Sequence, residues 1–262
     1  MKRMRIVGLC LVAMFAMSAL GATAAHAGEY GECVKQAKPY KGGFNDKNCQ
    51  EANAGKEGKY EWVPLNHVVN FTAKTKTTEL VGAAGNIQCS KSSTVGTMGP
   101  GSKENHEVIT FEGCEFKGPV NGDCHSAGQP GGVIVTNTLT TKLIDHGEKG
   151  LSGGEPAAGE VWNQFAGPPS SGIQAEYTCA SIVVLRTRGS VSGVFTSGSV
   201  NVMSKKALIE FNGVLGESPG KFGEQDLYSE ASIGGGPFEP AGPAIEKTTA
   251  QQKTAAKVEI KA

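Results

Sequence analysis

Residues 85–96 read GNIQCSKSSTVG and residues 105–125 read NHEVITFEGCEFKGPVNGDCH, and together they decide the class of fold. In the second stretch Ile109 and Phe111 fall on one face of an extended chain, while Thr110 falls on the other. A period of two with β-branched residues is typical of half-buried antiparallel strands. Both stretches also contain cysteines, so we expect a sheet that is cross-linked by disulfides.

The same pattern extends over most of the chain. Helical periodicity is absent, and 37 glycines punctuate the strand-length runs. Asn121-Gly122 and Asn212-Gly213 favour the positive φ angles of type I′ hairpin turns. The sequence therefore predicts an all-β antiparallel sandwich or barrel. The expected strands cover residues 68–74, 77–82, 87–95, 107–116, 133–144, 174–185, 190–196, 200–204 and 207–215.

A short internal similarity suggests a duplication. Residues 109–113 read ITFEG and residues 209–213 read IEFNG, and each follows a strand that contains a cysteine, Cys89 in one case and Cys179 in the other. A repeated β unit would explain the match. Chance recurrence of a short apolar and glycine pattern is the alternative, and it stays open.

The first 27 residues have the three parts of a secretory signal peptide. Basic residues precede an apolar run at residues 6–20, and Ala25-His26-Ala27 supplies the small residues of a cleavage site. The run is shorter than the ~20 residues that span a bilayer, and no later apolar run exceeds a few residues. We therefore expect a secreted, extracellular chain with no transmembrane segment after signal cleavage.

The charge balance excludes one class of partner. The whole chain has 25 basic and 25 acidic residues, and the leader removes basic residues only, so the remaining chain is slightly acidic. Nucleic-acid binding requires a basic patch or stripe that neutralises phosphates. We therefore expect no nucleic-acid partner.

Six cysteines remain after the leader, an even number in an exported chain, which predicts a disulfide framework. Six cysteines allow 15 pairings, and sequence alone does not choose among them. From loop closure we expect Cys33 with Cys49, Cys114 with Cys124, and Cys89 with Cys179. No C-x-x-C or H-x-x-x-H pair is present, which argues against a zinc site.

The composition divides the chain into four parts. Residues 1–27 are the cleaved signal peptide, and residues 28–64 form a polar N-terminal segment held by Cys33 and Cys49. Residues 65–231 hold the β core. Residues 232–262 are rich in glycine and proline at first, and residues 256–261 alternate as a possible last strand would.

Four motifs carry a resemblance to a known family. They are GEYGECVK at residues 28–35, GKYEWVP at 58–64, TELVGAAGNIQCSKSSTVG at 78–96 and VITFEGC at 108–114. In these motifs the chain resembles a large uncharacterised family of secreted proteins from soil actinobacteria, and the similarity covers most of the chain up to about residue 220. The resemblance implies an exported β-rich protein and implies no activity, because the family has no assigned function.

Three aromatic residues are candidates for a ligand platform. Tyr60 and Trp62 share a face at strand spacing and could stack a sugar ring, and Trp162 could rim a binding groove. Packing in the interior is the alternative for each of them, because aromatic side chains bury large areas.

Candidate catalytic groups are weak. GLSGG at residues 150–154 matches G-x-S-x-G, but a nucleophile elbow needs a helix after the serine, and Glu155-Pro156 follows instead. Asp145-His146, and Asp123 with His125, place a carboxylate near an imidazole, which is also the usual composition of exposed turns. We predict no catalytic residues, no cofactor and no metal site.

The expected function follows from these observations. We predict a secreted, non-catalytic binding or structural protein of the extracellular or envelope space, with an unknown partner that could be a glycan or an envelope component. The alternative is a carbohydrate-binding module or a glycan-active hydrolase. For hydrolysis, two carboxyl groups would face each other across a cleft, and they would be glutamates because aspartate is scarce.

Overall fold

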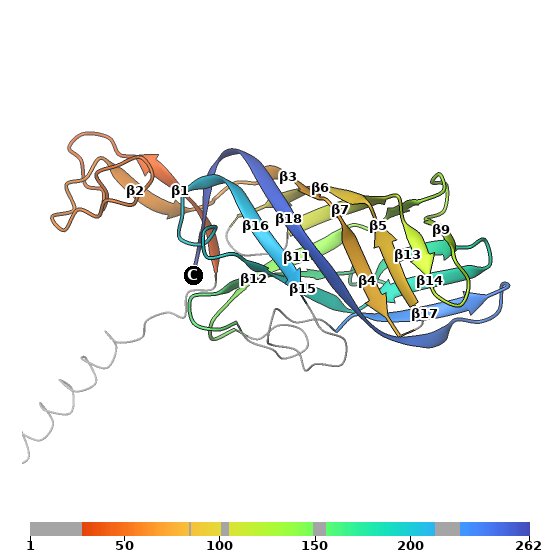
Figure 1. Ribbon diagram of the computed structural model, residues 1–262. Helices are drawn as coiled ribbons and strands as arrows, with labels where there is room; N and C mark the ends of the chain where they lie inside the picture. Colours follow the sequence, from red (N-terminus) through yellow and green to blue (C-terminus); the bar gives the residue numbers. More distant parts are fainter. Residues whose placement is uncertain (1–27, 84, 101–104, 149–155, 213–225) are drawn as a thin grey trace, which may run out of the picture.

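The computed structural model describes residues 28–83, 85–100, 105–148, 156–212 and 226–262. Over these ranges the chain is all-β, without a helix, as the alternating sequence predicts (Figure 1). The strands are β1 (Glu29–Lys35), β2 (Tyr60–Pro64), β3 (Val69–Thr75), β4 (Thr78–Gly82), β5 (Gly85–Cys89), β6 (Lys91–Met98), β7 (Asn105–Glu112), β8 (Glu115–Lys117), β9 (Gly122–His125), β10 (Val133–Val135), β11 (Leu139–Asp145), β12 (Val161–Ala166), β13 (Ile173–Cys179), β14 (Val183–Arg188), β15 (Ser190–Phe195), β16 (Ser204–Asn212), β17 (Tyr228–Ile233) and β18 (Glu239–Lys261).

Eight strands close into an antiparallel barrel, which decides between the two predicted architectures. Around the barrel the order is β3, β6, β7, β11, β12, β15, β16 and β18, and β18 pairs again with β3. Each of these strands therefore pairs with a neighbour on both sides, and each has one face toward the inside of the barrel and one toward the outside. The side chains of the inward face form the first apolar core, which includes Phe71, Leu143, Phe165 and Phe211.

The pairings close a second ring, which we call the cystine ring. Its order is β4, β5, β8, β9, β13, β14, β17 and β18, and β18 pairs again with β4. The ring encloses a second apolar core, which includes Ile87, Phe116, Tyr177 and Leu185. The two cores therefore belong to two rings of strands rather than to two separate domains.

Strand β18 belongs to both rings. Residues 239–247 pair with β17 and β4 in the cystine ring, and residues 247–253 pair with β16, with the last residues reaching β1. In Figure 1 it is the long blue strand that crosses the whole molecule. The possible last strand at residues 256–261 is therefore the end of a much longer strand, which also includes the Gly/Pro-rich residues 239–243.

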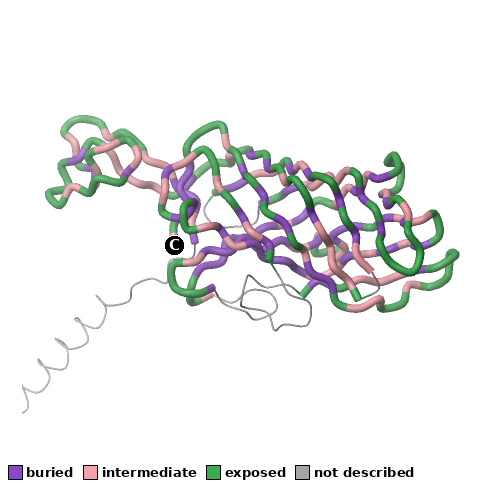
Figure 2. Tube along the Cα trace, viewed as in Figure 1, coloured by how far each residue is buried: buried purple, intermediate pink, exposed green. Residues whose placement is uncertain are grey.

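Strands β1 and β2 form an arm that projects from one end of the barrel (Figure 1). Tyr30 is buried in the barrel core, whereas the loops between Lys35 and Tyr60 are largely exposed (Figure 2). The Asp46 carboxylate accepts backbone N–H groups from Asn48, Gln50 and Glu51 at 2.8–2.9 Å. The bond from Glu51 is the main reason why the pKa of Asp46 lies below its usual value. The Cys33–Cys49 disulfide closes this segment, as predicted.

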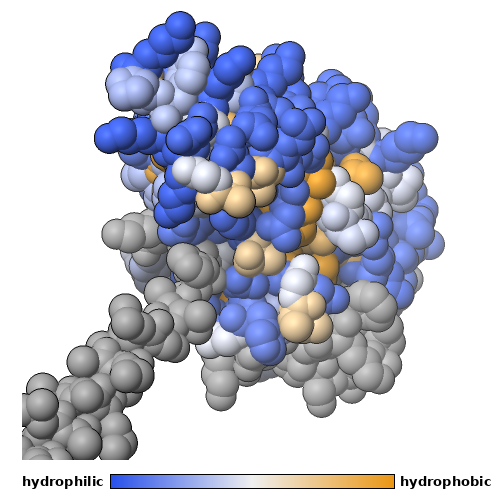
Figure 3. All heavy atoms as spheres, turned by 90° about the vertical axis from the view of Figure 1, so that its left-hand side faces the viewer, coloured by the Kyte–Doolittle hydropathy of each residue, from blue (hydrophilic) through white to orange (hydrophobic). Residues whose placement is uncertain are grey.

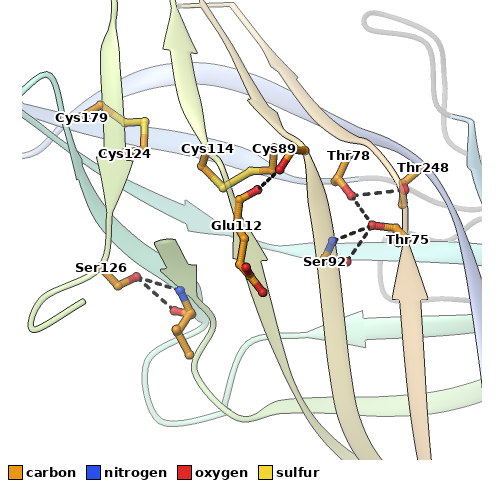
Figure 4. The surroundings of a disulfide bond; sticks show 12 residues. Thr75, Thr78, Cys89, Ser92, Glu112, Cys114, Cys124, Ser126, Cys179 and Thr248 are labelled. Carbon is orange, nitrogen blue, oxygen red and sulfur yellow. Dashed lines mark hydrogen bonds between the residues drawn. A yellow bond between two sulfur atoms is a disulfide. The ribbon is translucent and has the colours of Figure 1, made fainter. Parts of the chain in front are cut away.

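The other two predicted disulfides are wrong. The structure pairs Cys89 with Cys114 and Cys124 with Cys179. All four cysteines lie in one row: Cys89 ends β5, Cys114 directly precedes β8, and Cys124 and Cys179 pair across β9 and β13 (Figure 4). A bond between the two central cysteines of the row, Cys114 and Cys124, would leave Cys89 and Cys179 at its two ends without a cysteine next to them. Bonds between Cys89 and Cys114 and between Cys124 and Cys179 oxidise all four.

Candidate functional site in the polar interior of the barrel

The inward face of the barrel carries polar side chains as well as apolar ones. On β7 the inward positions are Asn105, Glu107, Ile109 and Phe111, because side chains alternate along a strand. Asn163 on β12 and Gln252 on β18 also lie two residues from core residues of their own strands, so they face inward as well. Asn105, Asn163 and Gln252 are each 2% exposed and Glu107 is 3% exposed. The barrel therefore encloses amides and a carboxyl group in addition to its apolar core.

Several of these polar atoms have no hydrogen-bond partner among the described residues. They are both side-chain polar atoms of Asn105, Oε1 of Glu107, Oδ1 of Asn163 and Oε1 of Gln252. More than nine in ten buried polar groups in folded proteins are hydrogen-bonded, so a cluster of exceptions indicates an ordered water, an ion or a bound molecule. This cluster is the strongest indication of a site in the described part of the chain.

A network of hydroxyl groups lies beside this cluster. The Thr75 hydroxyl lies 2.9 Å from that of Ser92 and 3.0 Å from that of Thr78. Thr78 continues to Thr248 at 3.2 Å, and Thr248 donates to the Thr77 carbonyl oxygen at 2.8 Å (Figure 4). These groups satisfy one another across β3, β4, β6 and β18. They form a hydrogen-bonded polar wall.

Two cavities border the polar cluster. One, of about 30 Å³, lies inside the barrel, and Glu107, Glu246, Thr94 and Gln252 are among its lining residues. The other, of about 70 Å³, lies between the two cores and is lined mainly by apolar side chains such as Phe111 and Tyr177. Glu246 lines both cavities, as do Ile109, Phe165 and Phe211. The interior thus has a cavity with both polar and apolar lining residues next to one that is lined mainly by apolar side chains.

Burial dominates the electrostatics of this interior. It raises the pKa of Glu107 well above its usual value, and the charge of Glu246 raises it further. Burial raises the pKa of Glu246 to about 7. The pKa of Tyr30 is also raised, first by burial and then by the charge of Glu107. No lysine or arginine is among the residues that line either cavity.

The candidate platform residue Trp162 is buried. Its side chain is 1% exposed, and in the sheet it pairs with Ile144 of β11 and Val194 of β15. This burial favours the interior-packing alternative.

Tyr60 and Trp62 lie on one strand, as expected, and both are half-buried. The Trp62 ring covers Gly31, where an added Cβ would lie 2.2 Å from the ring, and the Lys261 ammonium group lies 4.2 Å from the ring centroid. Burial raises the pKa of the nearby Glu259, while Lys261 and the Trp62 indole N–H oppose the shift. Trp62 is therefore engaged within the protein, where it joins β1, β2 and the end of β18.

The candidate catalytic groups lie at two separate places in the structure. Asp145 accepts the backbone N–H of His146, and His146 Nδ1 lies 3.0 Å from the Pro156 carbonyl oxygen, so both residues organise a turn. Asp123 and His125 lie on β9 in the cystine ring, on a different part of the sheet. The G-x-S-x-G motif at residues 150–154 lies outside the described residues.

Sequence reasoning missed Glu107, Glu246 and Gln252. A signal existed for Glu107, because it has the same parity on its strand as Ile109 and Phe111 and therefore faces inward with them. The Gly/Pro-rich start of β18 concealed the strand that positions Glu246 and Gln252.

Comparison of the chain with models of protein families, with curated proteins and with solved structures gave no match. Among the residues that the structure describes, none belongs to a helix long and apolar enough to cross a membrane. Function must therefore be argued from the residues themselves.

Proposed function

We propose that this chain is exported and acts as a non-catalytic binding or structural protein in the extracellular or envelope space. The observation that carries the proposal is the row of four cysteines in the cystine ring. Cys114, Cys124 and Cys179 are fully buried there, and both disulfides lie in an apolar core. Disulfides persist in oxidising compartments, whereas in the cytosol the same cysteines would be kept as free thiols.

The signal-like leader and the motifs similar to those of secreted proteins support the same compartment. A rigid scaffold that presents loops is a common design for binding. In this chain the arm is the most extended part of the described surface, and the end of the molecule that carries it is mainly hydrophilic with a narrow apolar strip (Figure 3). The arm is therefore the surface that we assign to the partner.

The experiment is expression with export, followed by three measurements on the purified protein. We expect a mature N-terminus at residue 28, no free thiol, and no turnover on a panel of glycoside and ester substrates. A glycan array, run with the intact protein and with a variant that lacks the arm residues 36–59, tests the carbohydrate alternative. Turnover of any substrate would overturn the non-catalytic assignment, and free thiols in exported material would overturn the compartment. Arm-dependent glycan binding would establish the carbohydrate-binding alternative instead.

A further inference from the structure

The larger cavity lies where the two apolar cores face each other, and we call it the seam cavity. Its lining includes Leu139 and Phe165 of the barrel core, and Ile87 and Tyr177 of the core of the cystine ring. Leu80 also lines it and packs against both cores. The cavity therefore lies at the seam between two rings of strands that each pack their own interior.

The volume of the seam cavity exceeds that of an ordinary packing defect. Protein interiors contain few voids larger than a water molecule. A water needs roughly 10–15 Å³ of such volume, so about 70 Å³ corresponds to about five to seven particles of that size. An apolar cavity of this size costs free energy unless something fills it, because its lining atoms lose dispersion contacts. A molecule of matching size restores those contacts.

The polar side chains of the lining are hydrogen-bonded within the protein. The Tyr177 hydroxyl lies 3.0 Å from that of Thr187, and the Thr136 hydroxyl accepts the backbone N–H of Ile109 at 3.0 Å. The Gln174 amide donates to two backbone carbonyl oxygens, at 3.0 and 3.4 Å. Of the buried side-chain polar atoms that lack a partner in the described part of the chain, none belongs to a residue that lines this cavity. The seam cavity therefore offers little to hold a water molecule, which needs two to four polar partners.

The smaller cavity differs in this respect. Glu107 and Gln252 line it, and each has a side-chain oxygen without a partner among the described residues. Its volume of about 30 Å³ holds about two water molecules, which can donate to these oxygens. Glu246 lines both cavities, and burial raises the pKa of its carboxyl group to about 7, so the group is neutral in mildly acidic solution. The two cavities therefore favour different occupants, water in the smaller one and an apolar molecule in the seam cavity.

We propose that the seam cavity binds one small apolar molecule, a compact hydrocarbon or aromatic ring of about five to seven non-hydrogen atoms. A cavity lined by leucine, isoleucine and phenylalanine stays dry and binds ligands such as benzene or xenon. A polar ligand is disfavoured, because its polar group loses its hydrogen bonds to water and finds no unpaired partner in the lining. The site is separate from the arm, and this inference does not depend on the proposed function.

The test is a titration of the full, oxidised protein with benzene at pH 6, followed by NMR of labelled methyl groups. We expect saturable shifts of the methyl signals of Ile87, Ile134 and Leu139, which line the cavity. Ile182 and Ile233 are 50% and 69% exposed, so their signals report adsorption of benzene to the surface and should not change. Phenol adds a hydroxyl group to the same ring and should bind at least ~10-fold more weakly than benzene.

Two variants locate the site. Ala175 lines the seam cavity, so Ala175→Leu should fill part of it and weaken benzene binding at least ~10-fold. Ala231→Leu is the matched control, because Ala231 packs partly buried against the same core and is not among the lining residues. If Ala175→Leu does not accumulate, a crystal of the wild-type protein under xenon gas replaces it and should show xenon in the seam cavity.

Four results would overturn the proposal. They are benzene shifts that do not saturate or that appear only at Ile182 and Ile233, phenol binding as tight as benzene binding, unchanged benzene affinity in Ala175→Leu, and loss of binding in Ala231→Leu. In the crystal, xenon bound elsewhere and not in the seam cavity would have the same consequence.

Discussion

Removing the Cys124–Cys179 disulfide should destabilise the whole protein, whereas removing Cys33–Cys49 should loosen only the arm. The bond between Cys124 and Cys179 spans 55 residues of sequence, and chain entropy assigns about 4 kcal/mol to a loop of this length. The bond between Cys33 and Cys49 spans 16 residues, for which the same relation gives about 3 kcal/mol. Loop length alone therefore predicts similar effects for the two pairs.

The structure separates the two cases. Cys124 and Cys179 are fully buried in the core of the cystine ring, so their replacement by alanine also removes packing. Cys33 and Cys49 lie in the arm, outside both apolar cores. We expect the double variant C124A/C179A to lose at least ~4 kcal/mol in the free energy of unfolding. We expect C33A/C49A to lose less than ~1 kcal/mol in the same measurement, because the arm opens independently of the rings.

Urea denaturation followed by circular dichroism gives both values, and limited proteolysis of C33A/C49A should show cleavage within residues 36–59. If C124A/C179A does not accumulate, stepwise reduction of the wild-type protein with mass mapping replaces it, and Cys33–Cys49 should be reduced first. Equal losses of stability in the two variants, or reduction of Cys124–Cys179 first, would refute the reasoning.

Three further outcomes follow from the structure. With divalent ions removed, the free energy of unfolding should be up to about 3 kcal/mol lower at pH 8 than at pH 4.5. Burial raises the pKa of Glu246 from 4.5 to about 7, so between these pH values the folded state holds a proton that the unfolded chain releases. Urea denaturation across pH should show a smaller loss of stability in Glu246→Gln, and an unchanged loss would contradict the assignment. Trp162→Ala should lower the free energy of unfolding by ~3–5 kcal/mol and Trp62→Ala should lower it less, because Trp162 is fully buried and Trp62 is half-buried. Equal losses for the two variants in urea denaturation would contradict this ranking. Gly31→Ala should destabilise the protein because its Cβ would lie 2.2 Å from the Trp62 ring, and the double variant with Trp62→Ala should lose less than the sum of the single losses, as a double-mutant cycle can verify.

Alternation along the chain predicted the class of fold and many strand positions, but it merged β5 with β6, β10 with β11 and β13 with β14, placed a strand at residues 200–203 where there is none, and missed β12 and β17. Period two depends on neighbouring residues, and it is visible in a single sequence. Closure into rings depends on pairs such as Gln252 with Ala73, which are far apart in sequence and leave no local pattern. The cysteines show the same limit, because the short loop between Cys114 and Cys124 favoured a bond that the ladder does not form.

The site was harder to predict than the fold. A glutamate in an alternating strand is usually taken as an outward residue, and only its parity with Ile109 shows that Glu107 points inward. For the aromatic candidates, residue type alone did not distinguish Trp162 from Trp62, because burial is decided by the neighbouring strands.

The shared strand β18 sets the order in which this protein is made. Ribosomal synthesis delivers the N-terminus first, and β18 follows the other described strands in the sequence. Neither ring can close before β18 is available, so the native state forms only after this strand has been made. Until then the sheet edges that β18 covers stay open to other chains.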